Sequence, residues 1–247
     1  MSIDKVRFDI AREKIIGKDR ERIGIGTLSE KTLHAVLKHY YAPNEDMHEI
    51  PIETFVADIY TGTEIIEIQT RAMDRMRKKL EAFLPLYPVT IVYPIPRQKW
   101  LYWIDEETGE ISKKRKSPQK GNPYQAFVEL YKIRPFLSHP NLRLRLAFID
   151  MEEYRLLNGW SKDRKKGSER YDRIPTEFAE ELCIDCTRDY MQLIPYELPE
   201  QFTVKDFAKC VKIPARLAGV ILLIFTELEL VNRIGKRGNS YLYEVKE

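Results

Sequence analysis

The sequence predicts a protein of the α/β (α+β) class, with a main domain built on a central sheet and a smaller C-terminal unit. Three observations lead to this prediction. Two short apolar runs flank a Thr-Gly-Thr turn within residues 57–70, which is typical of a β-hairpin. Val89–Tyr93 is a nearly continuous apolar run, as in a strand buried on both faces. Residues 202–245 show two helical segments followed by two short strand segments.

The composition of the 247 residues is that of a soluble globular protein, with 43% hydrophobic and 32% charged residues. No stretch approaches the length of an apolar transmembrane helix, and the first residues lack an apolar signal core. We therefore expect a cytoplasmic protein without membrane contact. Three cysteines fit a reducing compartment. The formal net charge of +3 is too small to indicate a nucleic-acid partner by itself, but the basic residues are clustered.

The first predicted helix runs from about Thr27 to Tyr41, after an N-terminal extension over residues 1–26 that packs on the core or is partly mobile. Thr27-Leu28-Ser29-Glu30 fits a capping box at its start, and Pro43 ends it. Its apolar residues recur at helical spacing and form one buried face: Leu33, Val36, Leu37 and Tyr40. His48–Thr54 is the first predicted strand, and it leads into the hairpin.

The hairpin carries polar side chains that can converge. Side chains alternate along a strand, so Glu67 and Gln69 share one face while Ile66 and Ile68 share the other. On the preceding strand, Asp58 points away from its two apolar neighbours. Two carboxylates with a nearby carbonyl form an oxygen-rich site suited to Mg²⁺ or Mn²⁺.

Asp58, followed nine residues later by Glu67-Ile68-Gln69, resembles the D…ExK signature of the PD-(D/E)xK nuclease superfamily, with Gln in the Lys position. The order helix, strand, strand, strand, helix, strand over roughly residues 28–95 is similar to the αβββαβ core of that superfamily. The resemblance implies a restriction-endonuclease-like domain over residues 1–172, with its core at about 28–157 and a mixed central sheet.

The same resemblance implies metal-dependent hydrolysis of phosphodiester bonds in double-stranded DNA. Asp58 and Glu67 would hold Mg²⁺ or Mn²⁺, which polarises the phosphate and lowers the pKa of a bound water. The amide of Gln69 would position a water or donate to a phosphate oxygen. Some restriction enzymes with an ExQ motif still cut, so Gln69 leaves activity open. Cleavage of both strands uses two active sites, which suggests a homodimer.

Three further residues near the motif have two interpretations each. The first helix of the superfamily often lends an acid to the metal site, so Glu30 either has this role or only caps its helix. Glu49 is a second candidate for an outer acid, or a solvated carboxylate at a strand edge. Residues 71–84 form a predicted amphipathic helix, in which Arg71 either contacts phosphates or belongs to a solvated face.

The middle of the chain contains the densest basic segment. Lys99–Asp105 and Glu110–Ser112 form a second predicted hairpin, and residues 113–121 follow with five cations among nine residues. These cations either contact nucleic acid or lie in a solvated loop. The residues that we expect to contact nucleic acid here are Lys113, Lys114, Arg115 and Lys116.

Between this segment and the C-terminal unit, Tyr124–Leu137 is a predicted helix and Leu144–Ile149 a predicted strand. Glu152–Leu157 is predicted to be a helical or turn end. Residues 158–173 are rich in basic residues with glycine and serine, which favours a linker and a second basic surface that includes Lys165 and Lys166. The C-terminal unit is therefore expected over residues 173–247.

Residues 202–245 resemble a winged helix-turn-helix module. The first helix runs from Thr203 to Val211, the second opens at Pro214, and two wing strands join through a basic, Gly-rich tip. The second helix is apolar on nearly every side and is predicted to be buried, so the module contacts DNA mainly through phosphates or docks on a protein surface. The expected DNA contacts are Lys212, Arg216, Arg233, Lys236 and Arg237.

Two alternatives to a nuclease stay open. A non-catalytic DNA-binding regulator that keeps the nuclease fold is favoured by Gln69 and by the modest net charge. A protein-interaction scaffold, with the winged helix as a dimerisation element, is favoured by the apolar second helix.

Overall fold

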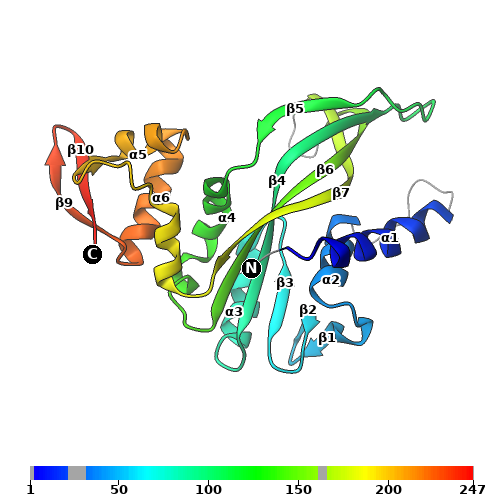
Figure 1. Cartoon of the computed structure of the whole chain (residues 1–247), viewed down its shortest axis with the longest axis horizontal. Helices are drawn as coiled ribbons and strands as arrows, with labels where there is room; N and C mark the ends of the chain where they lie inside the picture. Colours follow the sequence, from blue (N-terminus) through cyan, green and yellow to red (C-terminus); the bar gives the residue numbers. More distant parts are fainter. Residues whose placement is uncertain (1–2, 22–31, 161–165, 247) are drawn as a thin grey trace.

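The computed structural model describes residues 3–21, 32–160 and 166–246 of the chain. These residues form a seven-stranded sheet with helices on both faces, and a three-stranded sheet with two further helices (Figure 1). The large sheet has the order β1-β2-β3-β4-β6-β7, with β5 paired to β4, and it contains parallel and antiparallel pairs. The predicted α+β class with a mixed central sheet is therefore confirmed.

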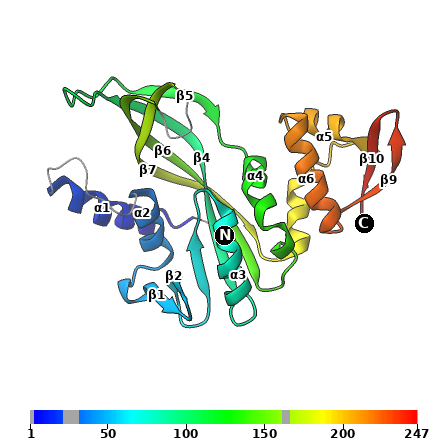
Figure 2. The ribbon, with the colours of Figure 1, turned by 180° about the vertical axis from the view of Figure 1, so that it is seen from behind.

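Two N-terminal helices, α1 (Lys5–Glu21) and α2 (Thr32–Tyr41), cover one face of the large sheet (Figure 2). Their buried side chains form one cluster with strand residues: Phe8, Ala11, Leu33, Val36, Leu37, Ile66 and Ile68. The first predicted helix is confirmed from Thr32 onward, whereas its capping box at residues 27–30 lies outside the described residues. Part of the N-terminal extension is thus a helix packed on the core.

The hairpin predicted within residues 57–70 is confirmed. After a short 3-10 turn, η1 (Glu45–Met47), three antiparallel strands follow in sequence: β1 (His48–Ile52), β2 (Phe55–Tyr60) and β3 (Ile65–Ile68). Strand β1 ends before Thr54 because Glu53 turns the chain with a positive φ of 54°. All four residues of β3 are buried, since helices cover both faces of the sheet.

Helix α3 (Arg77–Phe83) crosses the opposite face, so β3 and β4 (Val89–Ile104) run parallel. The helix predicted over residues 71–84 is shorter than expected. Ala72 has a left-handed φ of 58°, which an α-helix cannot continue through, and the 3-10 turn η2 (Met73–Met76) separates it from α3. The predicted apolar face is buried: Met73, Met76, Leu80 and Phe83. From α2 to β4 the order is helix, three strands, helix, strand.

Long strands extend the sheet beyond its helices into a twisted projection (Figure 1). We call this projection the arm; it comprises residues 97–104, 115–120, 151–160 and 166–175. It is built from β4 together with β5 (Arg115–Lys120), β6 (Leu142–Trp160) and β7 (Lys166–Ile184). Part of the basic segment predicted as a possible loop is therefore strand β5, paired with β4.

Two predictions for the arm were wrong. Residues 152–157 are strand instead of a helical or turn end, and β7 begins at Lys166 inside the predicted linker. The division placed between residues 172 and 173 passes through β7. The physical reason lies in pairing across the strands, which local composition does not show. Tyr154 stacks on Tyr102 of β4 with 4.8 Å between ring centroids, and β6 and β7 pair along nearly their whole length.

The helix predicted at Tyr124–Leu137 consists of three short pieces. These are η3 (Pro123–Ala126), α4 (Phe127–Leu130) and η4 (Tyr131–Phe136). Ile133 departs from helical geometry, and Pro135 lacks the N–H that a continuous helix needs. A further 3-10 segment, η5 (Thr187–Leu193), follows β7 and leads to the C-terminal unit.

The C-terminal unit has the predicted order of elements. It contains β8 (Phe202–Thr203), α5 (Val204–Cys210), α6 (Ala215–Glu227), β9 (Val231–Arg237) and β10 (Ser240–Val245). The hydroxyl of Thr203 accepts the N–H of Asp206 and caps α5. Within the residues described, no helix combines the length and apolar character needed to cross a membrane.

Helix α6 is buried on one side, where it lies against α4 of the same chain, although its sequence predicts burial all round (Figures 1 and 2). The ring of Phe225 on α6 lies 5.5 Å from Phe127 on α4 and 6.2 Å from Phe207 on α5, measured between centroids. One hydrophobic core therefore continues from the large sheet into the C-terminal unit. The apolar helix that suggested docking on another protein is covered here by the main part of its own chain.

Candidate functional site

Asp58 and Glu67 meet at the place where strands β2 and β3 separate. The two strands pair at Tyr60 with Ile65 and at Ile59 with Ile66. The same register would place Asp58 opposite Glu67 at the next step. There the side-chain carboxylate of Asp58, and not a backbone carbonyl, accepts the next hydrogen bond from β3. Its Oδ2 accepts the N–H of Ile68 at 2.8 Å. We call Asp58 and Glu67 the acidic pair.

Helix α2 supplies a side-chain partner of Asp58. The Nε2 atom of His34 lies 3.2 Å from Asp58 Oδ2, and the side chains of both residues are 23% exposed. Burial acts to raise the pKa of Asp58, but the His34 contact and the N–H of Ile68 outweigh it, so the pKa is below its ordinary value. Asp58 is therefore ionised at neutral pH. His34 therefore contacts the acidic pair.

Helix α3 supplies the partner of Glu67. The Nζ atom of Lys79 donates to both carboxylate oxygens of Glu67, at 2.9 and 2.8 Å. Glu67 is only 2% exposed. Burial and the negative charge of Asp58 raise its pKa to about 7, although Lys79 favours the ionised form. Glu67 thus exchanges a proton near neutral pH.

Gln69 bonds to the loop backbone in this structure, and its predicted role toward a water or a phosphate stays a prediction. Its Nε2 atom donates to the carbonyl of Arg71 and, at 3.3 Å, to the carbonyl of Ala72. These bonds hold the loop that turns from β3 into α3, including the left-handed Ala72. The side-chain amide is therefore committed to the backbone of the loop, and Lys79 is the donor at the acidic pair.

Sequence reasoning missed Lys79 because it belongs to a run of cations that was assigned to a solvated face. Its spacing carries the signal that was overlooked. Lys79 lies three residues after Met76 and four before Phe83, both of which are buried, so it borders the buried stripe of α3. A lysine at this border can extend its ammonium toward the sheet.

Of the two candidate outer acids, only Glu49 belongs to the described residues. Glu30 lies outside them. Glu49 has a positive φ of 53° and a side chain that is 67% exposed, and it accepts a bond from Lys38 at 2.9 Å. This supports the interpretation of Glu49 as a solvated carboxylate. In the described part of the chain, no group of three or more His, Cys, Asp or Glu side chains is placed to hold a metal ion.

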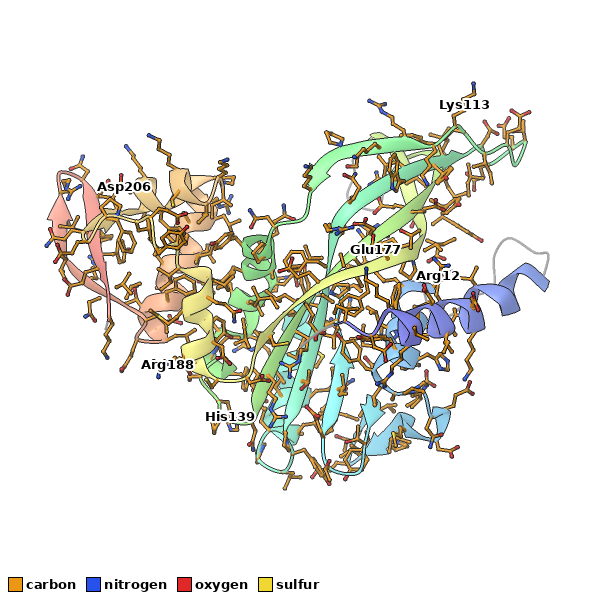
Figure 3. All side chains as sticks on the ribbon, viewed as in Figure 1. Arg12, Lys113, His139, Glu177, Arg188 and Asp206 are labelled. Atoms are coloured by element: carbon orange, nitrogen blue, oxygen red, sulfur yellow. The ribbon has the colours of Figure 1, made fainter. Side chains whose placement is uncertain are left out.

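The basic residues predicted to contact nucleic acid fall into separate places. Lys113 and Arg115 are exposed, and Figure 3 shows Lys113 near the end of the arm. The ammonium groups of Lys114 and Lys116 lie 4.8 and 5.5 Å from the ring centre of Trp100. Lys165 lies outside the described residues, and the same holds for the side chain of Lys166.

The remaining predicted contacts lie in the C-terminal unit, far along the molecule from the arm. Figure 3 shows Asp206 of this unit and Lys113 of the arm toward opposite ends of the view. In the hairpin of β9 and β10, Arg233 and Lys236 lie over the ring of Tyr241, at 3.0 and 5.4 Å from its centre. The other three cations are not buried: Lys212, Arg216 and Arg237. The predicted contacts that the structure describes here thus lie in two separate regions, the arm and the C-terminal unit.

A buried glutamate in the arm was not predicted as a site. Glu153 on β6 is fully buried and accepts bonds from Arg155 at 2.8 and 2.6 Å and from Arg173 at 2.9 Å. Lys99 Nζ and Arg170 Nε each lie 3.6 Å from its carboxylate. Burial acts to raise the pKa of Glu153, but the surrounding cations lower it to about 2. We call these five residues the Glu153 cluster.

Comparison with known proteins gives a family and a relative, both without an established function. The family described as "Domain of unknown function (DUF8091)" matches residues 31–185. An "Uncharacterized protein" from Treponema pallidum (strain Nichols) is 28% identical over 192 residues, which cover 75% of this chain and 74% of the relative. No solved structure matches.

Proposed function

This chain belongs to the DUF8091 family, and we propose that it is a metal-dependent nuclease that hydrolyses phosphodiester bonds in double-stranded DNA. The observation that carries this proposal is the acidic pair, two carboxylates set against each other where β2 and β3 separate. The PD-(D/E)xK resemblance implies one acid on each of these two strands, at the positions of Asp58 and Glu67.

The chain topology supports a restriction-endonuclease-like core. The elements from α2 to β4 follow the order αβββαβ. Strand β2 is antiparallel to β3, and β3 is parallel to β4, with α3 as the crossover between them. The two helices lie on opposite faces of the sheet and supply His34 and Lys79 to the acidic pair.

The chemistry of the acidic pair fits Mg²⁺ or Mn²⁺. Mg²⁺ is commonly bound through one or two carboxylates, with water and substrate phosphate completing its coordination. Asp58 and Glu67 supply two carboxylates, and burial together with the negative charge of Asp58 raises the pKa of Glu67, an effect that a bound cation would oppose. A divalent ion held there would polarise a phosphate and lower the pKa of a bound water.

The residues around the pair have defined tasks in this proposal. The Ile68 N–H and His34 fix Asp58 in its ionised form. Lys79 neutralises Glu67 while no other cation is present, and its ammonium can donate to a phosphate oxygen when the site is filled. Gln69 keeps the loop before α3 in place.

We also propose that the C-terminal unit is a winged helix that contacts DNA through phosphates. Helix α6 packs its buried side against α4 and is apolar elsewhere as well, so it offers few polar side chains for reading bases in the major groove. The start of the helix and the wing present cations instead. These are Lys212, Arg216, Arg233, Lys236 and Arg237.

A plasmid-nicking assay tests the nuclease proposal. Wild type is compared with Asp58→Asn, Glu67→Gln and Lys79→Met, each with Mg²⁺ and with Mn²⁺. Glu81→Gln is the matched control, because Glu81 is an exposed acid on α3. We expect wild type and Glu81→Gln to nick and the three site variants to lose most of the activity. Nicking that is equal in all five proteins would overturn the proposal.

A non-catalytic DNA-binding protein is the second candidate, and one observation favours it. Lys79 donates to both oxygens of Glu67, and Gln69 donates to the loop backbone. Groups of the chain itself therefore occupy the hydrogen-bonding positions that a metal ion or a phosphate would use. The same assay separates the two functions when DNA binding is measured in parallel. Binding without any nicking, in both metals, would favour the regulator.

A further inference from the structure

We propose that the Glu153 cluster in the arm is a phosphate-binding site that holds the backbone of DNA. The choice of DNA as the ligand rests on the proposed function. The excess of positive charge in the cluster is independent of the proposed function. Four cations surround one carboxylate, which leaves three positive charges without a compensating acid in the cluster (4 − 1 = 3).

Strand pairing places the cluster on one face of the arm. Arg173 of β7 is the register partner of Glu153, and Arg170 is the partner of Arg155. Glu153 and Arg155 are two residues apart on β6 and therefore share a face. On β4, Lys99 lies two residues from Leu101, which pairs with Glu153. Three neighbouring strands thus direct their cations to one place.

The four cations divide into two groups by their contacts. Arg155 and Arg173 donate hydrogen bonds to Glu153 and neutralise it. Lys99 Nζ and Arg170 Nε lie farther from the Glu153 carboxylate, at 3.6 Å each. Arg170 Nε is buried and has no hydrogen-bond acceptor among the described residues. These two are the cations that an incoming anion would satisfy.

The pKa values agree with this division. Burial lowers the pKa of Lys99, and although Glu153 opposes this effect, the charges of Arg173, Arg155 and Arg170 add to it. Burial and the charge of Arg173 lower the pKa of Arg170 in the same way. The cluster therefore repels additional positive charge, and an anion would relieve that repulsion.

The exposure and chemistry of the cluster favour a phosphodiester. The side chains of Arg155 and Arg170 are 32% and 35% exposed, so the outer side of the cluster is open to solvent. A guanidinium group can donate two parallel bonds to a phosphate. Arg71, which is exposed in the loop after Gln69, acts electrostatically on Arg170. Positive charge therefore continues from the end of β3 to the arm, so one backbone can follow it.

Anisotropy of a short fluorescein-labelled DNA duplex tests the site, with EDTA present so that cleavage plays no part. Arg170→Gln and Lys99→Gln are each expected to weaken binding roughly tenfold at ~0.1 M salt and to lower the salt slope by about one. Arg170→Lys, which keeps the charge, should retain the slope. The matched control is Arg143→Gln, because Arg143 also lies on β6 with a side chain 39% exposed, and its salt bridge is to Glu64.

Thermal unfolding of each variant identifies any loss of folding, and only folded variants enter the comparison. Unchanged affinity and salt slope in both Arg170→Gln and Lys99→Gln would overturn the proposal. So would a small-anion site, recognised when inorganic phosphate raises the Tm of wild type but not of Arg170→Gln while both bind DNA equally. If nicking fails in every protein but DNA binding depends on Arg170, the phosphate site stands without the nuclease.

Discussion

Glu67 on β3 and Glu153 on β6 are both buried glutamates in one sheet, yet their carboxyl groups behave in opposite ways. Glu67 has one ammonium partner and a second carboxylate beside it, and its pKa is raised to about 7. Glu153 has four cationic neighbours, and its pKa is lowered to about 2. With burial nearly equal, at 2% and 0% exposure, the local balance of charge decides the protonation state.

The comparison also indicates what each region lacks. The acidic pair is short of positive charge, and a divalent cation would supply it. The Glu153 cluster has a surplus of positive charge, and a phosphate would offset it. Within the proposed function the acidic pair would act on one phosphodiester, and the Glu153 cluster would hold another part of the same DNA backbone.

The largest effect on stability is expected when the carboxylate is removed from the Glu153 cluster. Glu153→Gln leaves four cations without a compensating charge, so the free energy of unfolding should fall by about 3–5 kcal/mol. Urea unfolding at neutral pH measures this. Glu152→Gln is the control, because Glu152 is the next residue, is 20% exposed and pairs with Lys114. Equal losses in both variants would mean that the buried charge balance is unimportant.

A second prediction concerns the opposite pH dependence of the two glutamates. The pKa of Glu67 is about 7 in the folded chain against an ordinary value of 4.5, so the folded state holds the proton more tightly. Stability from Glu67 is therefore present at low pH and is lost as pH rises from 4.5 through 7, on the order of 2–3 kcal/mol. The pKa of Glu153 lies below 4.5, so its contribution is lost only as pH falls from 4.5 toward 2.

Urea unfolding of wild type and Glu67→Gln between about pH 5 and 8 measures this difference. The stability of wild type should decline relative to Glu67→Gln as pH rises, because only the carboxyl group ionises. Two stability curves that stay parallel over this range would show that Glu67 is ionised throughout.

A smaller effect is expected at Lys79. Lys79→Met removes the cation that contacts both oxygens of Glu67, so the pKa of Glu67 should rise further. The variant should lose about 1–2 kcal/mol at pH 8 and less at pH 6, where Glu67 is already mostly protonated. The comparison variant is Lys78→Met, since Lys78 is exposed on the same helix. A loss independent of pH at Lys79 would contradict the coupling to Glu67.

The smallest effect is expected at Gln69. Its amide donates to the Arg71 and Ala72 carbonyls, so Gln69→Ala should lower the free energy of unfolding by about 1 kcal/mol. Because these bonds hold the loop and not the acidic pair, the pH dependence of stability should stay that of wild type. A changed pH dependence would assign Gln69 a direct role at the carboxylates.

Local patterns predicted the parts of the fold that depend on nearby residues. The turn at residues 61–63 and the helix start at Thr203 are both determined within a few positions, and the structure contains each of them. The position of Asp58 beside Glu67 followed from the same hairpin pattern. The apolar sequence of α6 predicted burial, which holds for one side of the helix, but it did not identify α4 as the covering partner.

Contacts between distant strands were not predictable in this way. Residues 152–157 lack a clear strand pattern, because their strand form depends on pairing with β4 and β7. The Glu153 cluster combines residues from positions 99 to 173, and no local motif connects them. Lys79 reaches Glu67 only because the crossover helix lies over β3, which depends on the parallel pairing of β3 and β4.

The most direct test of the central claim is whether the acidic pair binds a divalent cation. Isothermal titration calorimetry with Mn²⁺ on wild type, Asp58→Asn, Glu67→Gln and Glu81→Gln measures this without reference to activity. We expect binding by wild type and Glu81→Gln, stronger at pH 8 than at pH 6 because Glu67 must lose its proton. Both pair variants should lose it. Equal binding in all four proteins, or none in wild type at pH 8, would contradict the acidic pair as a metal site.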